Sequence, residues 1–275
     1  MSRSQKEKTE AFRALHQRDR AFLLPNPYDR GTARLLAHLG FEALATTSAG
    51  AAFTAGKPDG AIGRDAALLH VKEIAAATDL PLNADLENGF GDAPEFAAET
   101  IRLAAAAGAS GGSIEDATGR ADRPIYEFQH AVARVRAAAE AAHSLPIPFT
   151  LTARAENFLY ARAGLNDTIK RLQAFQEAGA DVLYAPGIVA KEQIAEVVRS
   201  VGKPVNVLAG MPGFSLTVEE LSALGVKRVS VGGAFARAAL GAFLRAAREM
   251  KDRGTFTFLA DAASSREING IFSLE

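Results

Sequence analysis

The stretch 83–92, Asn-Ala-Asp-Leu-Glu-Asn-Gly-Phe-Gly-Asp, gathers acidic and amide side chains directly after a short apolar segment. Asp85 and Glu87 are two residues apart, so on an extended chain their side chains point to the same side. Two carboxylates held side by side repel each other unless a cation lies between them. Mg²⁺ takes oxygen ligands and keeps several waters, so the pair favours a magnesium site, with Mn²⁺ as a second fitting ion. A solvated acidic turn is the alternative that these ten residues leave open.

Composition limits the class of protein. Of 275 residues, 48% are hydrophobic and 23% are charged, which is typical of a globular protein with a sizeable core. The net charge of −1 gives no broad attraction for nucleic acid or an anionic membrane. The chain has no cysteine, which excludes disulfides, thiolate metal sites and a cysteine acid, and fits a reducing cytoplasm. No apolar run is long enough to span a bilayer, and residues 1–20 lack the apolar region of a secretory signal. We expect a cytoplasmic protein with no nucleic-acid or membrane partner.

Short apolar runs alternate with stretches of helical composition along the whole chain. The predicted strands are 21–24, 43–47, 82–84, 112–114, 149–152, 181–184, 205–208 and 228–231. The predicted helices are 4–19, 30–39, 64–78, 94–107, 124–143, 166–178, 190–200, 217–223 and 234–251. Eight such units predict a (β/α)₈ TIM-type barrel, as one domain over residues 1–275. Residues 1–20 flank it with a helix, and the apolar tail 254–275 docks on a surface. An open doubly wound sheet is the rival, but no G-x-G-x-x-G follows the first strand.

The active site of such a barrel lies at the C-terminal ends of its strands. Acidic residues follow the strands at 82–84 and 112–114, and Asp59 lies on a long loop, so these acids converge on a space that suits a metal ion. Arg154, at the end of the strand at 149–152, binds a substrate carboxylate or phosphonate, or else pairs with the acids. The polar residues found at strand ends are Asn26, Asp29, Thr47, Ser48, Asp59, Asp85, Glu87, Glu115, Asp116, Arg154, Glu156 and Asn206.

Residues missing from the strand ends exclude other chemistry. All five histidines fall in predicted helices or at their ends, which argues against a Ser–His–Asp triad or a histidine zinc site. No lysine lies in a predicted strand, which argues against a Schiff base. Metal-assisted stabilisation of an enolate from a 2-oxo or 2-hydroxy carboxylate remains. Gly210, Gly213, Gly232 and Gly233 are a competing cue, because barrels bind phosphate at such positions; tight turns are their other interpretation.

Several motifs together resemble the isocitrate lyase / phosphoenolpyruvate mutase superfamily along nearly the whole chain. They are Leu-Pro-Asn-Pro-Tyr-Asp at 24–29, Thr-Thr-Ser-Ala-Gly at 46–50 with Gly-Lys-Pro-Asp at 56–59, Ala-Asp-Leu-Glu-Asn-Gly-Phe-Gly at 84–91, Ile-Glu-Asp at 114–116 and Ala-Arg at 153–154. The resemblance implies a Mg²⁺-dependent barrel that makes or breaks C–C or P–C bonds through a pyruvate-like enolate. It also implies a homotetramer or dimer in which the C-terminal helix is exchanged between subunits.

The resemblance assigns roles to individual residues. Asp85 is the direct metal ligand, and Asp59, Glu87 and Glu115 hold the ion directly or through water. Thr47 and the backbone of Ser48 and Ala49 cradle the oxo acid, and Arg154 binds its anionic end. Glu115, Thr47 and Arg154 form the expected catalytic set, and Asn206 and Arg237 are further substrate contacts.

The loop after the strand at 112–114 departs from the family. The lyases carry Lys-Lys-Cys-Gly-His there and the mutases Lys-Thr-Asn, whereas this chain has Asp-Ala-Thr-Gly-Arg-Ala-Asp-Arg-Pro at 116–124. Arg120 and Arg123 close over an anionic substrate or are surface charges. The strand at 181–184 is followed by Ala-Pro-Gly, with no acid. We therefore expect a C–C lyase or decarboxylase whose enolate is protonated by solvent or another group. A P–C bond enzyme and an oxo-acid-binding protein without catalysis are the alternatives.

Overall fold

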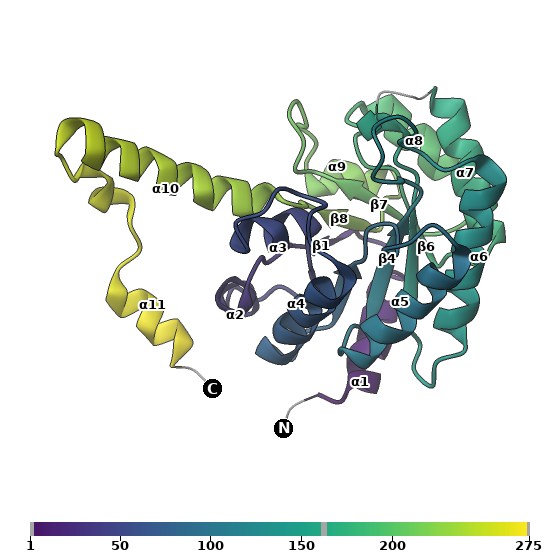
Figure 1. Ribbon diagram of the computed structural model, residues 1–275, viewed down its shortest axis with the longest axis horizontal. Coiled ribbons are helices and arrows are strands. Elements are labelled where there is room, and N and C mark those ends of the chain that lie inside the picture. Colours follow the sequence, from purple (N-terminus) through teal and green to yellow (C-terminus); the bar gives the residue numbers. More distant parts are fainter. Residues whose placement is uncertain (1–2, 161–163, 274–275) are drawn as a thin grey trace.

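Eight parallel strands form a nearly closed barrel in the computed structural model, which describes residues 3–160 and 164–273 (Figure 1). The strands follow one another around the barrel and β1 pairs with β8, while Ala45 N donates to Pro25 O (3.0 Å) across the remaining seam. The predicted TIM-type barrel is therefore confirmed. Residues 1–2 and 274–275 of the predicted flanking helix and tail lie outside the described residues. The strands are β1 (Phe22–Leu24), β2 (Leu44–Ala45), β3 (Leu82–Asp85), β4 (Gly111–Glu115), β5 (Thr150–Arg154), β6 (Val182–Tyr184), β7 (Val205–Leu208) and β8 (Arg228–Ser230).

Helices surround the barrel, and their small, apolar inner faces let them pack closely on it. Ala97, Ile101 and Ala104 of one helix and Ala138 and Ala142 of the next are almost completely buried. The helices are α1 (Gln5–Leu15), α2 (Arg30–His38), α3 (Ser48–Thr54), α4 (Arg64–Ala77), α5 (Pro94–Ala106), α6 (Phe128–His143), α7 (Leu165–Glu177), α8 (Lys191–Ser200), α9 (Val218–Ala223), α10 (Ala234–Arg253) and α11 (Ser265–Phe272), with short 3₁₀ turns η1 (Asn157–Tyr160) and η2 (Thr257–Asp261). None of the helices in the described ranges is long and apolar enough to cross a membrane.

Two predicted boundaries at the C-terminal end of the barrel were wrong. The helix expected from residue 124 begins at Phe128, because the preceding loop pairs with itself: Thr118 N donates to Pro124 O (2.8 Å) and Tyr126 N to Asp116 O (2.8 Å). The segment after β2, expected as a loop, forms α3. Thr47 is the N-cap of α3, and its hydroxyl accepts from Gly50 N (3.3 Å).

The flanking helix α1 closes the N-terminal end of the barrel. Its Phe12 and Leu15 pack with Phe22 and Leu24 of β1 in one buried cluster. His16 follows directly, and its ring meets those of Phe12 and Phe22 edge to face, with centroids 4.8 and 4.9 Å away. Helix α1 therefore closes the barrel at the N-terminal ends of the strands, and the C-terminal ends are the side that is open to solvent or a ligand.

The C-terminal helix α10 runs away from the barrel, and the tail turns back so that α11 contacts α2 (Figure 1). There, Arg34 Nη2 donates to Phe272 O (2.8 Å), and its guanidinium lies over the Phe272 ring. Ala236 is the one buried residue of α10. Large apolar side chains on α10 and the tail are exposed, namely Phe235, Leu240, Phe243, Leu244, Met250, Phe256 and Leu259.

Gly89 is needed in the turn that follows β3. Its φ is +79°, and a Cβ there would lie 2.9 Å from Ala97 Cα on α5. Gly60 also has a positive φ (+75°), but a Cβ there meets nothing within 4 Å. We predict that Gly60→Ala lowers the free energy of unfolding by about 1 kcal/mol through backbone strain alone, whereas Gly89→Ala lowers it by roughly 2–4 kcal/mol because the clash adds to the strain. Urea denaturation of both variants tests this, and equal losses would contradict it.

Candidate active site

Arg154, the last residue of β5, is bound by three carboxylates at the C-terminal end of the barrel. Its Nη1 lies 2.9 Å from Asp85 Oδ1, its Nη2 3.0 Å from Glu115 Oε2, and its Nε 2.8 Å from Glu156 Oε1. The register pairs Arg154 with Glu115 on β4 and with Tyr184 on β6, whose ring lies under the guanidinium. The structure shows that Arg154 pairs with the acids, and the binding of a substrate anion by the same guanidinium stays a prediction.

Asp85 ends β3 with both carboxylate oxygens engaged. Oδ1 faces Arg154, and Oδ2 accepts from the backbone N–H of Ser48 (2.9 Å) at the start of α3. The backbone N–H of Asp85 donates to Thr46 Oγ1 (2.8 Å). The carboxylate is therefore held between β2, α3 and β5, at the position expected from the sequence.

Glu87 lies in a turn after β3 and not on the extended strand that was expected. The strand ends at Asp85, and Glu87 has a φ of +48°, so the extended-chain argument for the pair was wrong. Such a conformation is strained for a residue with a side chain, and it persists only where the surroundings fix it. Glu87 Oε1 is buried and has no hydrogen-bond partner among the described residues. Burial raises the pKa of Glu87 to about 7, and the negative charges of Asp85 and Asp59 add to the effect.

Buried carboxylates continue behind Arg154. Burial raises the pKa of Glu115 well above its ordinary value and also raises the pKa of Glu156, although the positive charge of Arg154 opposes both shifts. The same three carboxylates outweigh the effect of burial on Arg154 and hold its pKa well above the ordinary value. Asp116 Oδ1 accepts from Glu156 N (2.8 Å) and Asp116 Oδ2 lies 3.0 Å from Arg171 Nη1, so these residues support the cluster from outside.

A cavity of about 180 Å³ lies beside the cluster. Seven of the predicted site residues line it: Thr47, Ser48, Ala49, Asp59, Asp85, Arg154 and Asn206. Glu87 and Glu115 are not among the lining residues. Arg237 is outside it as well, because α10 leaves the barrel there and Arg237 Nη2 donates to Gly210 O (2.8 Å). Sequence reasoning listed Glu156 at a strand end without a role, and it did not place Tyr184, Arg228 or Ser230 at the site; the alternation Arg-Val-Ser in β8 was a signal for the last two.

The backbone N–H of Gly232, the first glycine after β8, is already engaged within the protein. The N–H groups of Val231 and Gly232 both donate to Asn26 Oδ1 (3.0 and 2.9 Å). Asn26 Nδ2 in turn donates to Thr46 O (2.9 Å). The amide of Asn26 thus joins β1, β2 and β8, and this arrangement favours the tight-turn interpretation over a phosphate site.

The family profile of phosphoenolpyruvate phosphomutase matches residues 12–251. The chain belongs to this family. It is 31% identical over 268 residues to the 2-methylisocitrate lyase of Bacillus subtilis, which covers 92% of this chain and 84% of the lyase. A Burkholderia cenocepacia structure with a provisional lyase/mutase assignment is 64% identical, covers 98% of this chain and 96% of its own, and has a TM-score of 0.96. Phosphonopyruvate hydrolase in complex with oxalate and Mg²⁺ is 25% identical, covering 97% and 95%, with a TM-score of 0.85. Oxaloacetate acetylhydrolase with its product oxalate is 27% identical, covering 97% and 94%, with a TM-score of 0.86.

These relatives confirm the superfamily that the motifs indicated, and the chain is an enzyme of the lyase and mutase type.

The loop after β4, residues 116–124, is bound to the turn after β3 and does not border the cavity with its arginines. Arg120 Nη1 lies 2.5 Å from Asp92 Oδ2, and Tyr126 Oη donates to Asp92 Oδ1 (2.6 Å). Neither Arg120 nor Arg123 lines the cavity. Asp92 does not cap the next helix, because Ala93 is the N-cap of α5.

The carboxylates fit a hydrated divalent cation better than a fully enclosed one. Within residues 3–160 and 164–273, no three His, Cys, Asp or Glu side chains lie close enough to hold a metal ion by themselves. The donors are all oxygens, and the buried Glu87 Oε1 has no partner. An ion that takes one or two of these carboxylates and keeps several waters is compatible with both observations.

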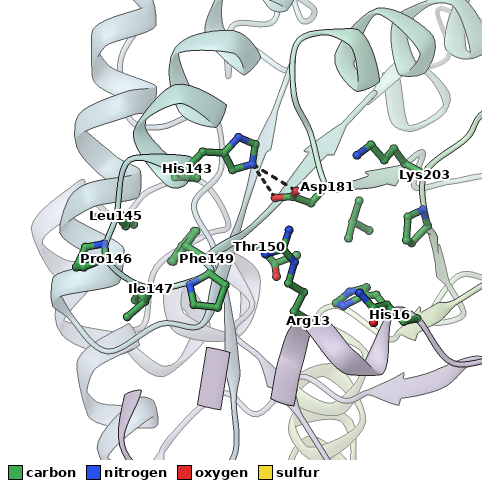
Figure 2. A pocket seen from close by; sticks show the side chains of 15 residues that line it. Arg13, His16, His143, Leu145, Pro146, Ile147, Phe149, Thr150, Asp181 and Lys203 are labelled. Carbon is green, nitrogen blue, oxygen red and sulfur yellow. Dashed lines mark hydrogen bonds and ion pairs between the residues drawn. The ribbon is translucent and has the colours of Figure 1, made fainter. Parts of the chain in front are cut away.

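A larger cavity, about 760 Å³, opens at the opposite end of the barrel (Figure 2). Arg13, Lys203 and the pair His143–Asp181 lie around it, with His143 Nε2 3.3 Å from Asp181 Oδ2. Chemistry in TIM barrels takes place at the C-terminal ends of the strands, and this cavity lies at their N-terminal ends. The smaller cavity beside Arg154 is therefore the candidate active site.

The raised pKa of Glu87 predicts how stability depends on pH without metal. The folded state holds a proton on Glu87 up to about pH 7, whereas the ordinary value is 4.5. Its contribution to stability is therefore complete below about pH 4.5 and is lost as pH rises through 7. We expect Glu87→Gln to flatten the fall in the free energy of unfolding over this range in EDTA, as measured by urea denaturation. Glu192→Gln on the exposed side of α8 is the control, and a Glu87→Gln profile parallel to wild type would contradict the assignment.

Proposed function

We propose that this protein is a Mg²⁺-dependent lyase that cleaves a C–C bond of a small 2-oxo or 2-hydroxy carboxylate through a pyruvate-like enolate. The observation that carries the proposal is the set of carboxylates held by Arg154 beside a small cavity at the C-terminal end of the barrel. A cavity of about 180 Å³ is below the size of pockets for drug-sized ligands, and it suits a substrate of a few carbon atoms.

Asp85 is the proposed direct ligand of the ion, and Asp59, Glu87 and Glu115 hold it directly or through water. The ion would supply Lewis acidity, polarising the 2-oxo group and offsetting the negative charge that develops on its oxygen. Mn²⁺ would bind the same oxygen donors. The presence of Mg²⁺ and oxalate in phosphonopyruvate hydrolase supports this assignment, since oxalate is a planar dianion of the size expected here.

The other site residues bind and orient. Thr47 fixes the first turn of α3, whose residues Ser48 and Ala49 line the cavity beside the proposed substrate carboxylate, with the N–H of Ser48 donated to Asp85. Arg154 sets the positions of Asp85 and Glu115 and presents its remaining N–H groups to the anionic end of the substrate. Asn206 lines the cavity with its amide fixed, because Oδ1 accepts from Arg228 and Nδ2 donates to Ser230. Arg237 has no part in this proposal.

The absence of cysteine shapes the reaction that we propose. Without the loop acid of the lyases, the enolate takes its proton from solvent or from another group at the cavity. Decarboxylation or a simple retro-Claisen or aldol cleavage of a short dicarboxylate meets this condition. Structural neighbours with this type of substrate include oxaloacetate acetylhydrolase and 2,3-dimethylmalate lyase (25% identical). A cytoplasmic location is part of the proposal and rests on the cysteine-free composition.

A screen of 2-oxo and 2-hydroxy di- and tricarboxylates tests the activity. We expect Mg²⁺-dependent release of pyruvate, oxalate or glyoxylate, lost in EDTA. Asp85→Ala should lower kcat at least 10³-fold, because it removes the proposed metal ligand, while Asp65→Ala on the exposed face of α4 should leave it unchanged. A fully active Asp85→Ala would overturn the metal assignment. Cleavage of a phosphonate alone would favour the P–C enzyme, and tight binding of oxo acids without product would favour a binding protein.

We also propose a homotetramer or dimer in which α10 is exchanged between subunits. The exposed apolar side chains of α10 support this, since Phe243 is 69% and Leu244 48% exposed in the single chain. We predict that the wild type elutes as an oligomer in light-scattering chromatography and that Phe243→Asp shifts it toward the monomer. Arg245→Asp introduces the same acidic side chain on the opposite, exposed side of the same helix and serves as the control. A monomeric wild type would refute the proposal.

A further inference from the structure

The interior of the barrel below the acid cluster is polar. Barrel interiors are usually filled by layers of branched apolar side chains. Here the inward positions hold hydroxyl, amide and guanidinium groups that are at most 6% exposed: Asn83, Ser113, Thr152, Asn206, Arg228 and Ser230. All of these except Thr152 line the 180 Å³ cavity, so the cavity reaches into this layer.

Arg228 is the charged member of the layer, and its partners are neutral. Its Nε donates to Asn206 Oδ1 (2.8 Å) and its Nη2 to Thr152 Oγ1 (3.0 Å), and its Nη1 lies 3.4 Å from His16 Nε2. His16 Nδ1 lies 2.9 Å from Phe12 O, a group that only accepts, so Nδ1 carries the hydrogen and Nε2 is the acceptor for Arg228. Burial lowers the pKa of His16 to about 3, and the charge of Arg228 adds to this, so the imidazole is neutral.

No carboxylate among the described residues forms an ion pair with Arg228, although the side chain is only 2% exposed. Burial lowers the pKa of Arg228 to about 9, which still leaves the guanidinium charged at neutral pH. A buried charge without a counter-ion is costly, and proteins normally pair it. The two arginines that line the cavity therefore differ: Arg154 faces three carboxylates and Arg228 faces none.

A second atom of the same layer lacks a partner. Asn83 Oδ1 is buried without a hydrogen bond in the part of the chain that the structure describes. Arg228 binds Thr152, which lies two residues before Arg154 on β5, so its guanidinium lies on the N-terminal side of Arg154 along that strand. The cavity thus has an acid-rich end that suits a cation and an inner end that suits an anion and a hydrogen-bond donor.

We propose that Arg228 binds a second carboxylate of the substrate inside the barrel and selects short dicarboxylates over monocarboxylates. The inference rests on the proposed function, because it assumes that the 2-oxo acid end of the substrate lies at the acid cluster. The substrate then spans the cavity, with its metal-binding end near Asp85 and its other carboxylate near Arg228. A small inorganic anion held permanently by Arg228 has the same binding chemistry, and the experiments below separate the two.

Calorimetric titration in the presence of Mg²⁺ tests the selection without turnover. The probes are 3,3-difluoropyruvate and 3,3-difluorooxaloacetate, which share the fluorinated 2-oxo acid end and differ in the second carboxylate. We expect the wild type to bind the dicarboxylate at least tenfold more tightly, as a charged hydrogen bond gives. Arg228→Met should abolish that preference and change 3,3-difluoropyruvate binding less than twofold, and Arg228→Lys should retain part of it. Arg199→Met on the exposed side of α8 is the control, since it also removes one positive charge but lies away from the cavity.

Crystallography of the wild type tests the same proposal without a variant. In crystals of the wild type soaked with Mg²⁺ and 3,3-difluorooxaloacetate, we expect a carboxylate oxygen about 3 Å from a terminal nitrogen of Arg228. A halide that stays at Arg228 after a bromide soak and is not displaced by the dicarboxylate would overturn the proposal. Preference for the dicarboxylate in Arg228→Met would also overturn it, and so would failure of both probes to bind. Retained preference together with no turnover on any substrate would leave Arg228 assigned and reject only the lyase.

Discussion

The contact of one guanidinium with three carboxylates is the interaction on which the site depends. Arg154 holds together the ends of β3, β4 and β5, because Asp85, Glu115 and Glu156 each come from a different strand end or loop. Removing charges from water costs several kcal/mol per ion, and a single cation offsets only part of this for three acids. The cluster therefore carries surplus negative charge, and Glu87 increases it. This deficit of positive charge supports the proposed binding of a divalent cation.

The opposite imbalance exists one layer deeper. Arg228 is surrounded by an amide, a hydroxyl and a neutral imidazole, so positive charge is in excess there. A barrel packed with branched apolar side chains would avoid both imbalances. Uncompensated buried charges are typical of functional sites, where a ligand completes them. The two ends of one small cavity thus carry opposite charge, as the proposed binding of a cation near Asp85 and of an anion near Arg228 requires.

The loop after β4 and the helix α10 show how this member departs from a shared scaffold. In the loop, Arg120 is paired with Asp92 and lies beside Tyr126, so these charges are directed away from the cavity. The cavity in this conformation is bordered instead by Leu159 and Pro186, which follow β5 and β6. Helix α10 runs away from the barrel that precedes it (Figure 1), and its large apolar side chains are exposed. The barrel itself is common to the family, and differences in chemistry come from such loops.

The sequence by itself determined the barrel and the place of its active site. Apolar runs of strand length, alternating with helical stretches, are local patterns, and glycines such as Gly89 mark turns whose backbone excludes other residues. The positions of Asp85, Glu115 and Arg154 followed, because strand ends meet at one face of a barrel. Tertiary structure alone decided which charges pair. The partners of Arg154 come from 69 residues before it to two residues after it, and inward orientation depends on register between strands. For the same reason the sequence did not assign Arg228 to the cavity, and it placed Arg237 there although α10 carries that side chain away.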